Sequence, residues 1–137
     1  MRYLIHLIRT YGHILSRNLL VGLMIVVGGI MSGGLLAVFI LWWNGFIFGT
    51  IIIKSIVLGI PPHILLLETV IHGPLEIFAF CWLGMLGLRS AKITYIFFKD
   101  GSISTVILPK LLEIMVPILL LVTAAFLEVW AMAYLGI

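Results

Sequence analysis

Three residues that could do chemistry, Glu68, His72 and Glu76, follow one another at four-residue intervals inside an apolar segment. On an unbroken helix their side chains would face the same way, because residues four apart share a helix face. A carboxylate and an imidazole at this spacing can bind a divalent metal such as zinc. His72 and Glu76 could instead act as a catalytic base and its orienting partner. The spacing therefore predicts a metal site or an acid–base site.

Ligands from one helix do not complete a metal site, so we expect Glu128 of the last apolar segment to join His72 and Glu76. Two structural roles for Glu76 compete with this chemistry. Pro74 would begin or kink a helix, so that Glu76 could cap the free N–H groups there. Alternatively, Glu76 pairs with Lys54 and both charges are neutralised. We expect Lys54 and Asn44 to be polar groups of the protein interior.

The composition predicts a membrane protein. The chain has 137 residues, of which 64% are hydrophobic and only 9% are charged, whereas soluble domains carry about 25% charged residues. Such a chain cannot cover a water-soluble surface, so we expect an all-α protein that spans the cell membrane several times in contact with the lipid bilayer. The net charge of +3 comes from basic residues beside apolar spans, which indicates membrane topology and excludes nucleic acid as a partner.

The first 17 residues predict an amphipathic helix that lies in the membrane interface, followed by a single transmembrane helical domain at 18–137. At helical periodicity the polar residues of this segment fall on one narrow stripe: Arg2, His6, Arg9, Thr10, His13 and Arg17. The stripe is either an anchor that sets the topology or a docking surface for a partner or for anionic lipid.

Residues 18–53 contain no charged residue and no histidine. A helix needs about 20 apolar residues to cross a bilayer, so Leu19 to Trp43 is predicted to span it. Gly29, Gly33 and Ala37 lie four residues apart and predict a face for close helix packing. The dipeptide Asn44-Gly45 predicts a turn after the span.

Two topologies, a bundle of four or of three crossing helices, compete for the rest of the chain. One has four spans at 19–43, 46–60, 63–88 and 106–136. The other has three crossings and a re-entrant hairpin at 44–71, which places seven of the eight basic residues on the side of the amino terminus. The positive-inside rule favours this second topology and a cytoplasmic amino terminus. Its hairpin needs shielding by protein, because polar backbone is not tolerated in lipid.

The polar motifs resemble the stage II sporulation protein M family of membrane proteins. The resemblance covers roughly residues 18–135 and rests on a Gly-rich first span, Gly22 to Gly34, and on three motifs in order: Asn44-Gly45, His72-Gly73-x-x-Glu76 and Ala-x-x-x-Glu128. The chain departs from the family by being short.

The resemblance implies a role in a membrane complex. Sporulation members of the family act in a complex that anchors peptidoglycan-degrading enzymes during engulfment. Other members are similar to proteins encoded with circular bacteriocins, which are needed for maturation of the peptide. The chain is therefore expected to be a small subunit that works with other membrane proteins as a scaffold for cell-envelope remodelling or for peptide maturation or export.

Two other functions stay open at the level of sequence. The first is an intramembrane metal-dependent hydrolase or peptide-processing enzyme that uses the candidate site residues. The second is ion or solute transport, for which Lys54 and the broken apolar segments are the motivation. We also expect a homo-oligomer, because a small chain has few helices to enclose its polar groups and because Gly29/Gly33 and Gly45/Gly49 favour close helix contact.

Overall fold

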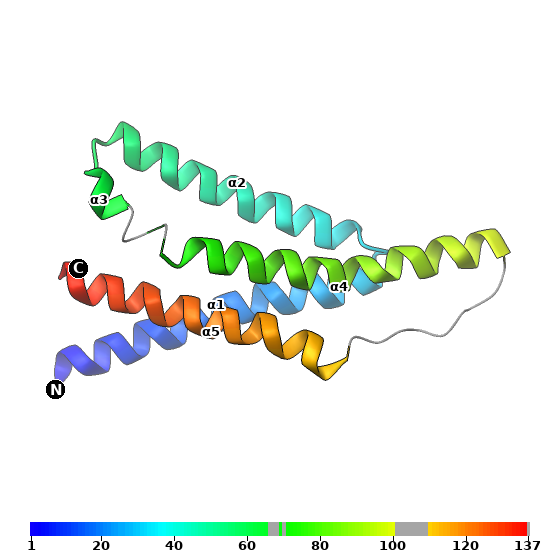
Figure 1. Cartoon of the computed structure of the whole chain (residues 1–137), viewed down its shortest axis with the longest axis horizontal. Helices are drawn as coiled ribbons and strands as arrows, with labels where there is room; N and C mark the ends of the chain where they lie inside the picture. Colours follow the sequence, from blue (N-terminus) through cyan, green and yellow to red (C-terminus); the bar gives the residue numbers. More distant parts are fainter. Residues whose placement is uncertain (66–68, 70, 101–109, 137) are drawn as a thin grey trace.

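The computed structural model describes residues 1–65, 69, 71–100 and 110–136, and within them the chain is almost entirely helical (Figure 1). The helices are α1 (Arg2–Met31), α2 (Leu35–Val57), α3 (Pro62–Leu65), α4 (Gly73–Asp100) and α5 (Leu111–Leu135). Three of them, α1 from Tyr3 onward, α2 and α5, are long and apolar enough to cross a membrane. The predicted all-α membrane fold is confirmed.

The four long helices run alternately in opposite directions (Figure 1). Both chain termini lie at the same end of the bundle as α3, and the turn between α1 and α2 lies toward the other end. Helix α4 packs against α1, α2 and α5. The first part of α4 lies between α2 and α5, and its carboxyl-terminal part extends beyond both helices (Figure 1).

Helices α1 and α4 touch through glycines. A Cβ added to Gly29 would lie 2.8 Å from the Cα of Gly87, and one added to Gly87 would lie 2.6 Å from the carbonyl oxygen of Ile25. Ala37 of α2 packs beside both glycines. The core continues from this crossing through Ile25, Ala79, Phe80, Leu83, Leu86 and Leu121. Gly29 and Ala37 therefore pack against each other inside the chain. They lie on α1 and α2, and not on the same face of a single helix.

The predicted span from Leu19 to Trp43 is wrong, because the chain turns at 32–34. Gly33 and Gly34 have φ angles of 62° and 95°, which side chains with a Cβ rarely adopt. The Ser32 hydroxyl donates to the carbonyl of Gly28 and accepts the N–H of Leu36. The turn is therefore formed by Ser32, Gly33 and Gly34. Of these residues, Gly33 is the one for which the sequence predicts a helix-packing face instead.

The predicted turn at Asn44-Gly45 is also wrong, because α2 continues through both residues. The Asn44 side-chain amide donates to the carbonyl of Ile40, 2.8 Å away on the same helix. In this position Asn44 satisfies its amide locally and leaves the helix intact. Residues 44–57 therefore belong to α2, and the structure has no separate re-entrant hairpin beginning at Asn44.

The basic residues are distributed over both ends of this bundle. Lys54 lies in the last turn of α2. This end of the bundle also holds α3, the chain termini and the basic stripe at the start of α1 (Figure 1). Arg89 and Lys99 lie in the opposite half of α4, and Lys110 precedes α5 at that end. The charge bias that favoured the three-crossing topology therefore disappears, and the cytoplasmic amino terminus stays a prediction.

Candidate functional site

Glu76 connects α4 to α1 by a hydrogen bond. The side-chain amide of Asn18 donates to Oε1 of Glu76 over 2.5 Å, and both residues are half-buried. Glu76 lies in the first turn of α4, where a carboxylate also interacts favourably with the helix dipole. The helix begins at Gly73, and a Cβ there would lie 2.6 Å from the Phe48 ring of α2. A glycine therefore allows the start of α4 to approach α2.

Glu128 of α5 and Arg17 of α1 complete a group that we call the polar cluster: Arg17, Asn18, Glu76 and Glu128. The charges of the two carboxylates interact unfavourably with each other, and the charge of Arg17 interacts favourably with each of them. Carboxylates are costly in an apolar bundle unless they are paired and hydrogen-bonded. Asn18 donates a hydrogen bond to Glu76 and so links α1 to α4, whereas Glu128 of α5 is connected to the cluster by charge interactions alone.

His72 lies in the turn before α4, where its backbone carbonyl accepts the N–H groups of Leu75 and Glu76. Its imidazole is half-buried, and among the described residues Nδ1 has no hydrogen-bond partner. Because α4 begins only at Gly73, His72 and Glu76 do not lie on one long helix as the spacing had suggested. Glu68, the third residue of that pattern, lies outside the described residues.

The structure does not bring Asn44 or Lys54 to the polar cluster. Asn44 bonds within its own helix, and Lys54 is exposed in the last turn of α2. Glu76 bonds to Asn18, and not to Lys54. Within the part of the chain that the structure describes, no three His, Cys, Asp or Glu side chains lie close enough to hold a metal ion. Because Glu68 is not in that part, the metal site stays a hypothesis.

Arg17 and Asn18 are the members of the cluster that the sequence analysis missed. Arg17 had been assigned to the amino-terminal basic stripe, and Asn18 had served only to mark the start of an uncharged stretch. A signal was present nevertheless, because Asn18 is the only strongly polar side chain between Arg17 and Ser32. A polar residue at the start of a membrane span often bonds to a neighbouring helix.

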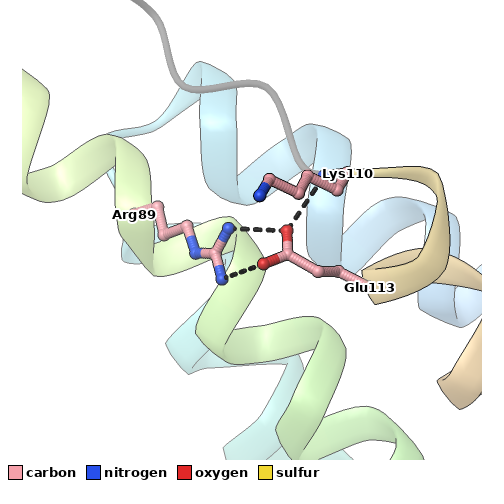
Figure 2. Close-up of polar contacts among 3 residues, drawn as sticks. All are labelled: Arg89, Lys110 and Glu113. Atoms are coloured by element: carbon pink, nitrogen blue, oxygen red, sulfur yellow. Dashed lines mark hydrogen bonds and ion pairs between the residues drawn. The ribbon is translucent and has the colours of Figure 1, made fainter.

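A second polar group, shown in Figure 2, joins α4 to α5 toward the other end of the bundle. The Arg89 guanidinium donates two hydrogen bonds to the Glu113 carboxylate, at 2.8 and 2.9 Å. The same carboxylate accepts the backbone N–H of Lys110 at 2.9 Å, which caps the start of α5. This group is solvent-accessible, and it joins the first turn of α5 to the middle of α4.

The family model described as stage II sporulation protein M matches residues 6–131, which include the whole polar cluster. The chain belongs to this family. The resemblance carried by the sequence motifs is thereby confirmed, and family membership agrees with the three membrane-length helices in making this an integral membrane protein. No curated protein and no solved structure matches the chain.

Proposed function

We propose that this family member is a small polytopic subunit of a membrane complex, in which its helical bundle serves as a scaffold for other membrane proteins. The observation that carries the proposal is the hydrogen bond between Asn18 and Glu76. The motif carboxylate bonds between two helices of the chain itself, and the single positive charge of Arg17 interacts favourably with Glu76 and with Glu128. Such an arrangement fixes the helices relative to one another, which is what a scaffold requires.

Two settings suit a scaffold of this family. One is cell-envelope remodelling during sporulation, the process that the family name mentions. The other is maturation or export of a membrane-active peptide. In both settings the work is done by partner proteins that need a fixed position in the membrane. The subunit contributes shape and lipid-facing apolar surface, which covers most of α2.

The test is a complementation experiment in the native host, with the chromosomal copy deleted and tagged variants of the full chain supplied. His72→Ala removes an imidazole that makes no bond to the polar cluster, whereas Glu76→Ala removes the carboxylate at its centre. Each variant is scored for growth phenotype, for membrane insertion, and for the size of the detergent-extracted complex. Asn44→Ala is the matched control, because its amide bonds only within α2.

The scaffold proposal predicts that His72→Ala and Asn44→Ala restore the phenotype and the complex, and that Glu76→Ala restores neither. A His72→Ala chain that assembles normally but does not restore the phenotype would contradict a purely scaffolding role. A wild-type chain that migrates alone in mild detergent would contradict the existence of the complex.

One observation supports the second candidate, a metal-dependent hydrolase or peptide-processing enzyme. The buried Nδ1 of His72 lacks a hydrogen-bond partner among the described residues, and an unsatisfied imidazole nitrogen is the atom that binds a metal. In this function Glu68 would have to complete a ligand set with His72, Glu76 and Glu128, because these three described residues do not by themselves lie close enough to hold a divalent metal such as zinc. This function is favoured if the His72→Ala chain assembles normally in the complementation experiment but does not restore the phenotype.

A further inference from the structure

A hollow lies on the amino-terminal part of α1, where its last lining residue, His13, is one helical turn before Arg17 of the polar cluster. It has a volume of about 340 Å³ and is lined by His6, Arg9, Thr10 and His13. These residues are spaced by three or four positions, so they share one helix face. Two imidazoles, a guanidinium and a hydroxyl are all groups that donate hydrogen bonds to anions. The lining of the hollow therefore fits an anion in its chemistry.

The charged side chains of α1 have one sign. No acidic residue precedes Glu68 in the sequence, and Glu76 and Glu128 of the other helices interact with Arg17. The side chains of His6, Arg9 and His13 are exposed, and Thr10 is half-buried. An anion that reached the hollow would therefore meet donors and a positive charge without competition from a carboxylate of the same segment.

The position of the hollow points to lipid as the source of the anion. Helix α1 continues without a break from the hollow into its apolar part, so the hollow lies at the amino-terminal end of the candidate span Tyr3–Met31. Tyr3, Leu4 and Ile8 are about 60% exposed on the same part of the helix. Apolar side chains beside a basic stripe are typical of a helix at the headgroup level, and an aqueous protein partner would leave part of this apolar surface uncovered.

We propose that the hollow lined by His6, Arg9, Thr10 and His13 binds the phosphate of an anionic phospholipid headgroup. The Arg9 guanidinium would pair with the phosphate oxygens, and the imidazoles and the Thr10 hydroxyl would donate to the remaining ones. The acyl chains of the lipid would then lie along the apolar side chains of α1. The site would fix how deeply α1 lies in the membrane.

Native mass spectrometry of the detergent-purified full chain tests the proposal. The protein is titrated with phosphatidylglycerol, with phosphatidylcholine of the same acyl chains, or with inorganic phosphate. The test variant is Arg9→Gln. Lys92→Gln is the matched control, because Lys92 is an exposed basic residue on α4 in the opposite half of the bundle. Circular dichroism of each variant establishes that the helices are retained.

The wild-type chain is expected to retain phosphatidylglycerol in preference to phosphatidylcholine. Arg9→Gln is expected to weaken phosphatidylglycerol binding about fivefold, because one basic residue near the surface contributes that much attraction to anionic lipid. Lys92→Gln is expected to bind as the wild type does. Equal retention of the two lipids, equal binding by Arg9→Gln, or an equal loss with Lys92→Gln would overturn the proposal. Binding of inorganic phosphate as strong as that of the lipid would assign the hollow to a soluble anion instead.

Discussion

Glu76 is the residue on which the polar cluster depends, because it bonds to α1 through Asn18 and interacts by charge with Glu128 of α5. The sequence could predict that Glu76 and Glu128 are close enough to interact by charge, since each is an isolated carboxylate in an apolar segment and such groups face the bundle interior. It could not predict the contact of Glu76 with Asn18. That pairing depends on the register between α1 and α4, which neighbouring residues in the chain do not determine.

The first prediction concerns Asn18. Replacing Asn18 with Ala removes the donor to a partly buried carboxylate, so we expect the free energy of unfolding to fall by about 1–2 kcal/mol. The measurement is reversible unfolding in mixed detergent micelles, followed by circular dichroism.

The control for this prediction is Asn44→Ala, which removes an amide bonded only to a carbonyl of its own helix. Its effect is expected to be the smaller of the two. A double variant with Asn18→Ala and Glu76→Ala shows whether the pair is coupled, since coupled residues give non-additive changes. Additive effects of the two substitutions would contradict the bond between α1 and α4.

Among the helices, α4 is the one that organises the packing. It is not among the three membrane-length apolar helices, yet it contacts all of them. The contact of α1 with α4 depends on Gly29 and Gly87, whose backbones leave no room for a Cβ. Small residues allow such contact in membranes, where apolar burial alone does not drive helices together.

The second prediction follows from this crossing. Gly87→Ala places a methyl group 2.6 Å from a backbone carbonyl oxygen of α1, so the helices must separate and we expect a loss of about 1–3 kcal/mol of stability. Gly12→Ala on α1 is the matched control, because nothing lies within 4 Å of its added Cβ. The control is expected to be neutral or stabilising, since alanine favours helix over glycine. Comparable losses for the two variants, measured by the same unfolding assay, would contradict the crossing.

The helix boundaries show what local sequence can and cannot predict. The long apolar runs of the sequence correctly predicted helices of membrane-spanning length. The position of the first turn was wrong, because Asn44-Gly45 and Ser32-Gly33-Gly34 are both turn sequences and a pattern of single residues does not rank them. What decides between them is tertiary: a turn at 32–34 lets Ala37 of α2 pack against the glycines of α1 and α4.

For the whole molecule, the alternation of the four long helices places both termini at the same end (Figure 1). The sequence left this open, because the charge distribution favoured a re-entrant hairpin at 44–71, whereas residues 44–57 belong to α2. Homo-oligomerisation stays a prediction. Of the two glycine pairs that suggested it, Gly29 packs inside the chain and Gly33 forms a turn, whereas Gly45 and Gly49 have no neighbour within 4 Å.

The third prediction concerns this topology. Reporter fusions at the amino and carboxyl termini are expected to report the same side of the membrane. In a Cys81→Ser background, single cysteines at Leu58 and at Lys110 are expected to react with a membrane-impermeant thiol reagent from opposite sides, because α4 lies between them. Labelling of both cysteines from one side would contradict the passage of α4 through the membrane.

The central claim is that the polar cluster is structural and that the protein is a scaffold. The most direct test is the metal content of the detergent-purified full chain, measured by elemental analysis for the wild type and for His72→Ala and Glu76→Ala. The scaffold account predicts far less than one transition metal per chain in all three proteins, with His72→Ala as helical as the wild type. One zinc or other transition metal per wild-type chain, lost in both variants, would contradict the account and favour a metal-dependent enzyme.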